Sequence, residues 1–184
     1  MAKLEELINK LRSPENKEVL KAVEELRVRG WLSDGSLRGI ALCKANLEGA
    51  DLMGADLSNV DLHQAHLEYA DLSMANLRAT KLTRTYLVGA NFSQADLSRA
   101  DLYKANFRGA RNLTEDILLK ALRLWGATMA DGEPYDGRYN LAADLDLARW
   151  RRINVRDAEA MAEFYGVPVE TYKQAQKLSI LATS

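Results

Sequence analysis

Leucine or phenylalanine recurs at every fifth residue through the middle of the chain, without a break. The fifteen positions are Leu37, Leu42, Leu47, Leu52, Leu57, Leu62, Leu67, Leu72, Leu77, Leu82, Leu87, Phe92, Leu97, Leu102 and Phe107. On an α-helix a five-residue step turns the side chain by about 500°, so these residues would circle the axis instead of lining one face. On one long strand the odd period would send successive leucines to opposite faces. The pattern therefore predicts a short extended piece and a corner in every repeat.

A small side chain usually stands two residues before each of these positions. Alanine takes that place ten times, at Ala45, Ala50, Ala55, Ala65, Ala70, Ala75, Ala90, Ala95, Ala100 and Ala105. Runs such as Ala45-Asn46-Leu47-Glu48-Gly49 resemble the A(D/N)LXX motif of the pentapeptide-repeat family. The resemblance implies an all-β solenoid core, a right-handed quadrilateral β-helix of about four coils with inward Leu, Phe and Ala. We expect α-helical caps on both flanks of this core.

Three domains are predicted from the repeat and from the composition of its flanks. They are an N-terminal helical cap (1–30), the pentapeptide-repeat β-helix (31–111), and a C-terminal helical cap and appendage (112–184). In the first, residues 3–11 are amphipathic, Ser13 and Pro14 are interpreted as the N-cap and first residue of a second helix, and Gly30 ends it. These helices would cover the open end of the first coil.

The repeat fails at Asn112, and the pattern after it favours helices. We predict one helix from Thr114 to Gly126 as a lid on the last coil, a loop over 129–140, and helices over 144–151, over 157–165 and from Val169 onwards. The tail segments 135–138 (Tyr-Asp-Gly-Arg) and 160–167 resemble tails that accompany pentapeptide repeats in bacterial, often photosynthetic, lineages.

The chain holds few groups that could perform catalysis or bind a metal. It has two histidines, His63 and His66, and one cysteine, Cys43. Cys43 and His63 would stack in adjacent coils, and the two histidines flank one corner, but two imidazoles without a third ligand are weak evidence for a metal site. We therefore assign no catalytic residue, no cofactor and no metal, and we expect the protein not to be an enzyme.

The charge of the repeat segment is balanced overall and uneven along its length. Residues 36–110 carry eight acids and eight bases, with six acids in 36–75 and six bases in 76–110. Some proteins that resemble this one regulate DNA gyrase by imitating duplex DNA, which requires a dense negative surface. The neutral coil disfavours that alternative and predicts an axial charge dipole instead.

Polar residues fall into columns when the coil is taken as about 20 residues long. Ten Asp or Asn residues precede central positions and are interpreted as hydrogen-bonding the corners. Lys81 would lie between Asp61 and Asp101 in a ladder of opposite charges. The candidate interaction stripe, which could receive an acidic partner, consists of Lys44, Gln64, Arg84, Lys104, Tyr103 and His63.

A basic-aromatic cluster in the tail, Arg149-Trp150-Arg151-Arg152, is interpreted as a solvated helix face because acidic residues surround it. We expect a non-catalytic scaffold whose partner is another protein, with nucleic acid and membrane not expected and a homodimer through the helical ends possible. The single cysteine and the lack of a long apolar run predict a cytoplasmic location.

Overall fold

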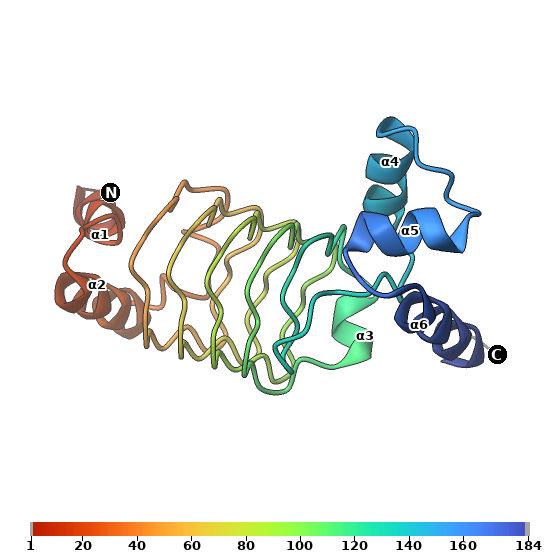
Figure 1. Ribbon diagram of the computed structural model, residues 1–184. Helices are drawn as coiled ribbons and strands as arrows, with labels where there is room; N and C mark the ends of the chain where they lie inside the picture. Colours follow the sequence, from red (N-terminus) through yellow and green to blue (C-terminus); the bar gives the residue numbers. More distant parts are fainter. Residues whose placement is uncertain (1, 183–184) are drawn as a thin grey trace.

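The computed structural model describes residues 2–182, with side chains to Lys177. The chain winds into a rod-like coil with helices at both ends (Figure 1). Helices α1 (Ala2–Lys10) and α2 (Asn16–Val28) lie at one end, and α4 (Ala142–Trp150), α5 (Ala158–Tyr165) and α6 (Val169–Ala182) at the other. A single helical turn, α3 (Glu115–Leu118), interrupts the last coil. No helix of the described part has the length and apolar character that crossing a membrane would need.

Parallel bridges between residues twenty apart join successive coils, from Ala41 with Asp61 to Asn91 with Arg111. Each side of the coil contributes one bridging residue, so within residues 2–182 no side lengthens into a continuous strand. The 20-residue coil with four repeats is thereby confirmed, as is the short extended piece between corners. The right-handed sense of the coil stays a prediction.

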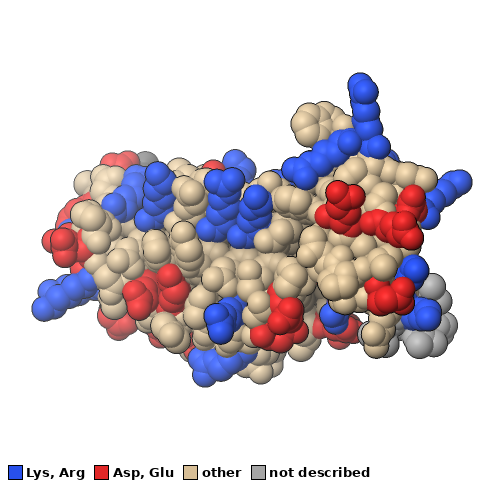
Figure 2. Space-filling view, in the orientation of Figure 1, with Lys and Arg blue, Asp and Glu red and all other residues tan. Residues whose placement is uncertain are grey.

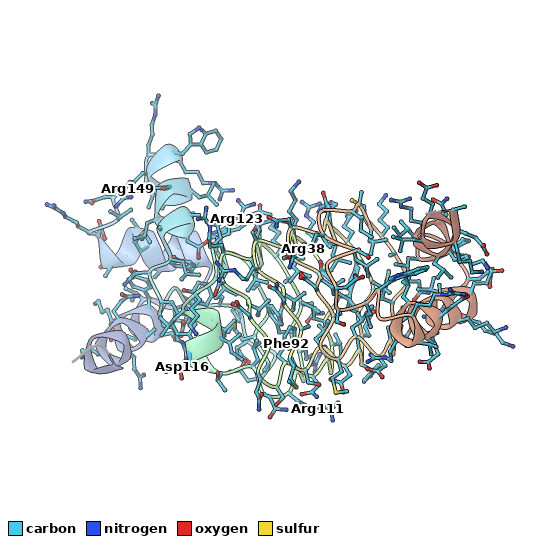
Figure 3. All side chains as sticks on the ribbon, turned by 180° about the vertical axis from the view of Figure 1, so that it is seen from behind. Arg38, Phe92, Arg111, Asp116, Arg123 and Arg149 are labelled. Carbon is cyan, nitrogen blue, oxygen red and sulfur yellow. The ribbon has the colours of Figure 1, made fainter. Side chains whose placement is uncertain are left out.

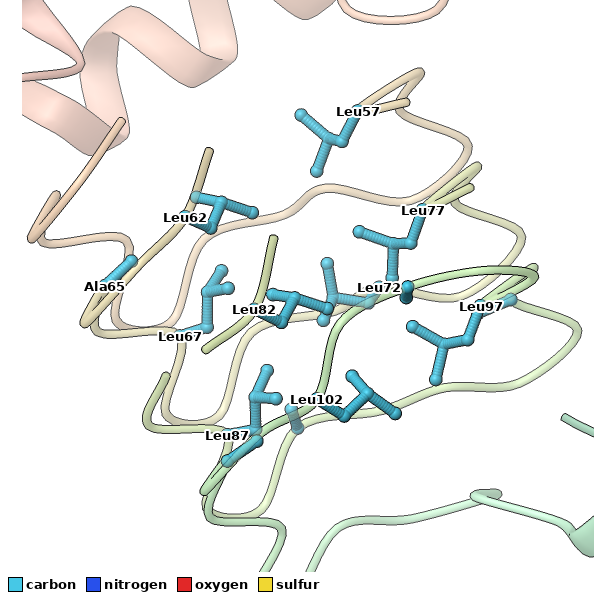
Figure 4. Close-up of a cluster of buried hydrophobic side chains, with 14 of the residues drawn as sticks. Leu57, Leu62, Ala65, Leu67, Leu72, Leu77, Leu82, Leu87, Leu97 and Leu102 are labelled. Carbon is cyan, nitrogen blue, oxygen red and sulfur yellow. The ribbon is translucent and has the colours of Figure 1, made fainter. Parts of the chain in front are cut away.

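The interior of the coil is filled by the central Leu and Phe residues and by the preceding alanines (Figure 4). All fifteen central side chains are buried, and so are the ten alanines of the motif. Thr80 and Thr85 replace alanine without leaving a buried hydroxyl unpaired, because each donates a 2.8 Å hydrogen bond to a carbonyl of the preceding coil, at Leu57 and Leu62. The predicted inward direction of both positions is confirmed.

Four corners turn each coil, and the residue at each corner has a positive φ. Ten of these corner residues in the coil are not glycine, among them Lys44 (φ 59°), Tyr69 (φ 59°) and Arg84 (φ 57°). The preceding Asp or Asn stabilises the turn by accepting a hydrogen bond from the backbone N–H two residues later, as Asp61 does from His63 at 3.1 Å. All ten predicted residues make this bond: Asn46, Asp51, Asp56, Asp61, Asp71, Asn76, Asn91, Asp96, Asp101 and Asn106.

Side chains of the two N-terminal helices and of the turn between them donate hydrogen bonds to carbonyls of the first coil. Arg12 donates to Ala41 O at 2.9 Å, Asn16 to the carbonyls of residues 46 and 48, and Arg27 to those of residues 51 and 53. In later coils the equivalent carbonyls accept N–H groups of the preceding coil. The cap therefore closes an edge that would otherwise be open to pairing with another chain.

The start of α2 differs from the prediction. Its N-cap is Glu15 and its first residue Asn16, two residues later than predicted. The Ser13 hydroxyl accepts from Glu15 N–H and donates to the Glu18 carboxylate, so it orders the turn before the helix instead of capping it. Gly30 (φ 73°) follows the end of the helix as expected.

The predicted helix over 114–126 is wrong. Only Glu115–Leu118 is helical, and the chain then resumes the coil, with bridges from Asp101 to Arg123 and from Asn106 to Thr128. These pairs are 22 residues apart, so α3 absorbs a two-residue insertion. Hydrogen bonds to the preceding coil replace those of a longer helix. Arg99 N–H donates to the carbonyl of Lys120, and Leu122 N–H donates to the carbonyl of Ala100.

The coil thus extends past the boundary predicted at residue 111, and the division into three domains stays a prediction. At its C-terminal edge Asp144 of α4 accepts hydrogen bonds from the N–H groups of Leu124 and Trp125 at 3.1 and 3.0 Å. Ten other repeats supply the acceptor for the second of these N–H groups from their own Asp or Asn, but the corresponding residue here is Arg123. A side chain from the next helix therefore replaces a missing corner residue.

The tail helices match the predicted ranges to within two residues, and the Tyr-Asp-Gly-Arg segment anchors them. Tyr135 is buried and its hydroxyl accepts from Tyr139 N–H at 3.0 Å, while Asp136 pairs with Arg138 at 2.8 Å. Tyr135 also contacts Tyr165 of α5 edge-to-face, with ring centroids 5.5 Å apart. The buried cluster is continuous from α1 to α6 through the coil.

Candidate interaction edge

One corner of the coil carries the predicted stripe, and we call its column Lys44, Gln64, Arg84 and Lys104 the basic edge. Hydrogen bonds between coils put it in register: Lys44 N–H donates to His63 O, Gln64 N–H to Thr83 O and Arg84 N–H to Tyr103 O, at 2.8 to 3.0 Å. All four residues have a φ between 55° and 59°. Because the backbone is alike at each corner, the four side chains leave the coil in the same way.

Three of the four residues of the basic edge are cations. Lys44, Arg84 and Lys104 are exposed, and none makes an ion pair with any residue that the structure describes. The column beside them, with His63 and Tyr103, contains no carboxylate either. Figure 2 shows that Lys and Arg gather in a row along the coil on the face in view. Their positive charge is available to an acidic partner.

The basic edge continues into the last coil through an aromatic pair. Lys104 N–H donates to Trp125 O at 3.0 Å, which places Trp125 in the column of Tyr103. The two rings stack with centroids 5.3 Å apart, and Lys104 Nζ lies 5.5 and 5.2 Å from their centroids. Gly126 permits this arrangement, because a Cβ there would lie 2.9 Å from Lys104 Cγ.

Sequence reasoning missed Trp125, since a constant step of twenty residues from Tyr103 leads to Arg123. The two-residue insertion at α3 displaces the column. The signal in the sequence is the order Leu124, Trp125, Gly126, Ala127, in which a central leucine, a corner glycine and an inward alanine keep the repeat spacing.

A pocket of about 500 Å³ opens beside Trp125, between the last coil, the segment 151–154 that follows α4, and α5. We call it the arginine pocket, and Trp125, Arg151, Arg152, Ile153, Glu163 and Phe164 line it. The Arg151 guanidinium lies 4.7 Å from the Trp125 ring centroid and 5.9 Å from that of Phe164. Trp125 Nε1 donates to Phe164 O at 2.8 Å, which fixes the indole.

The tail cluster is therefore more than a solvated helix face. Arg149 is paired with Asp146 at 2.8 Å, and Trp150 is 79% exposed, in line with the prediction. Arg151 and Arg152 instead turn to the pocket. Figure 3 shows Arg149 on α4 and Arg123 at the adjacent end of the coil.

Cys43 and the histidines show no reactive arrangement. Partial desolvation and the neighbouring Asp61 carboxylate raise the pKa of the Cys43 thiol, which disfavours the thiolate that a nucleophile needs. His66 stacks on Tyr86 with centroids 4.6 Å apart, and its Nδ1 lies 3.0 Å from Glu68. Among the described residues no group of three or more His, Cys, Asp or Glu could hold a metal ion.

The predicted charge ladder forms on one side only. Lys81 Nζ lies 3.4 Å from Asp61 Oδ2. Asp101 is occupied instead by Arg123, whose guanidinium makes two hydrogen bonds of 2.6 Å to the carboxylate. A bidentate arginine pair is more strongly held than a single lysine contact, so Arg123 takes the carboxylate that Lys81 was expected to share.

The fold and the edge define a capped solenoid that displays side chains in fixed columns. A family model for pentapeptide repeats matches eight copies over residues 36–73, 45–84 and 75–111. Residues 36–111 of the chain therefore consist of pentapeptide repeats. A comparison with curated proteins found no match.

Three solved structures of pentapeptide repeat proteins are similar. One, from the cyanobacterium Cyanothece 51142, is 30% identical over 49% of this chain and 56% of its own, with a TM-score of 0.40. Another, from the Arabidopsis thaliana thylakoid lumen, is 36% identical over 45% of this chain and 55% of its own, with a TM-score of 0.39. HetL from Nostoc sp. strain PCC 7120, described as involved in heterocyst differentiation regulation, is 26% identical over 58% of this chain and 45% of its own, with a TM-score of 0.38. The chain spans about half the length of these proteins.

Proposed function

We propose that this protein is a non-catalytic scaffold that binds another protein through the basic edge. The observation that supports the proposal most strongly is the alignment of three cations, Lys44, Arg84 and Lys104, in register with the Tyr103 and Trp125 rings. None of the three makes an ion pair with a residue that the structure describes. Arginine, tyrosine and tryptophan are the residue types that most often dominate the binding energy of protein interfaces.

The coil suits this role because it fixes the backbone positions that carry the side chains before a partner binds. Successive corners are held about 4.8 Å apart by hydrogen bonds between coils. A partner then loses little binding free energy to ordering the scaffold, and opposite charge raises its rate of encounter. Regulation of a DNA-handling enzyme such as gyrase stays a prediction that no observation on the described residues favours.

A pair of charge reversals tests the proposal. Arg84→Glu combined with Lys104→Glu inverts the basic edge, while Lys17→Glu combined with Lys21→Glu makes the same change of net charge on the exposed face of α2. Tagged wild type and both variants are used for affinity capture from the native lysate, after circular dichroism confirms equal folding. We expect a set of proteins that wild type and the α2 variant retain and the edge variant loses. Identical captured proteins for all three would contradict the proposal.

A further inference from the structure

The arginine pocket places charged groups against fixed aromatic walls. The Arg151 guanidinium lies within cation–π distance of both the Trp125 ring and the Phe164 ring. A guanidinium in this position can still donate its N–H groups to a ligand. This geometry suits a carboxylate, which accepts two such hydrogen bonds.

The charge of the pocket also favours an anion. Arg151 and Arg152 make no ion pair with any described residue, and Glu163 is the one carboxylate among the residues that line the pocket. Arg152 has a φ of 62° at the position after α4 where α2 and α5 are followed by glycine, at Gly30 and Gly166. Two arginines, Arg151 and Arg152, therefore follow the end of α4 where the chain borders the pocket.

The pocket is continuous with the basic edge. Trp125 belongs to both, because Lys104 Nζ lies 5.2 Å and the Arg151 guanidinium 4.7 Å from the centroid of its ring. From the coil of Lys44 to that of Trp125 there are four steps of about 4.8 Å, or roughly 19 Å, which about six extended residues span. A single extended segment can therefore reach from the first coil into the pocket.

We propose that the arginine pocket binds a carboxylate of an extended acidic segment from the partner protein, and that the rest of this segment lies along the basic edge. The apolar walls of Trp125, Phe164 and Ile153 contact the methylene groups of the side chain that carries this carboxylate. This inference rests on the proposed function and names the chemistry of the partner.

The test uses a fluorescein-labelled peptide of six glutamates and fluorescence anisotropy at low salt. Arg151→Gln removes the guanidinium in the pocket, whereas Arg149→Gln makes the same change two residues earlier, at a side chain already paired with Asp146. We expect Arg151→Gln to weaken binding at least about fivefold and Arg149→Gln to change it less than about twofold. Added salt should weaken binding to the wild type.

The outcomes separate the pocket from the edge. If the Arg84→Glu, Lys104→Glu variant loses the peptide while Arg151→Gln binds it as the wild type does, the pocket assignment is overturned and the basic edge stands. Absence of saturable binding to the wild type, or equal losses in Arg149→Gln and Arg151→Gln, would also overturn the pocket assignment. Tighter binding of a six-nucleotide single-stranded DNA that depends on Arg151 would overturn the acidic protein segment as the occupant.

Discussion

The side-chain amide of Asn16 donates a 3.1 Å hydrogen bond to the backbone carbonyl of Asn46, across the junction between α2 and the first coil. The same amide reaches the carbonyl of Glu48 at 3.1 Å. These two carbonyls have no coil before them to supply N–H groups. One asparagine therefore replaces part of a missing neighbouring coil, and Arg12 and Arg27 do the same on other sides.

Replacing Asn16 by leucine should destabilise the protein by about 1–3 kcal/mol, because it leaves two backbone carbonyls without their donor. Chemical denaturation followed by circular dichroism measures the loss. Lys17→Leu is the matched control, since Lys17 is exposed and should change stability by less than about 0.5 kcal/mol. Equal stability of the two variants would contradict the role of Asn16 in closing the edge.

Asp144 closes the other end of the coil and should give the stability a distinctive pH dependence. Burial raises the pKa of Asp144 to about 6, against the effect of the two N–H bonds that it accepts. In the unfolded chain the pKa returns to an ordinary value near 3.8. Between these values the folded state binds more protons than the unfolded state, so this group lowers the free energy of unfolding as the pH rises from about 4 to about 6.

The prediction is checked with Asp144→Asn, which keeps the size of the side chain and removes its titration. The free energy of unfolding of wild type minus that of the variant should fall by on the order of 2 kcal/mol between about pH 4 and pH 7. Asp56, Asp61, Asp71 and Asp96 have lowered pKa values and act in the opposite direction, but they do so in both proteins and cancel in the difference. A difference that does not change with pH would show that Asp144 is not buried as described.

The interior of the coil could be predicted from the sequence because every repeat has the same local structure. Leu62, its inward neighbour Val60 and its corner-forming Asp61 repeat an arrangement that the period alone specifies. The ends could not be predicted in this way. Arg12, Asn16 and Arg27 look like solvated residues on a helix, and their role depends on carbonyls about 24 to 32 residues away.

Only the part of the candidate site that follows the repeat could be predicted from the sequence. Lys44, Arg84 and Lys104 follow the constant step and were found, whereas Trp125 lies after a two-residue insertion. Arg151 and Phe164 reach the edge only because the tail helices pack against the last coil. Contacts between elements distant in the chain leave no periodic signal.

Gly137 shows how tightly the tail is held. It has a φ of 80°, and a Cβ there would overlap the edge of the Tyr165 ring, with Tyr165 Cδ2 at 2.7 Å. The Gln176 side chain donates to its carbonyl at 3.1 Å, so α6 also depends on this position. The residue lies where the loop, α5 and α6 meet.

Gly137→Ala should therefore cost about 3 kcal/mol or more, since it adds overpacking to the strain of a positive φ. Gly166→Ala is the matched control, because Gly166 has a φ of 72° but nothing lies within 4 Å of its Cβ position. That variant should lose only about 1 kcal/mol, from backbone strain alone. Thermal denaturation of both variants separates the two effects, and equal losses would mean that Tyr165 does not pack against Gly137.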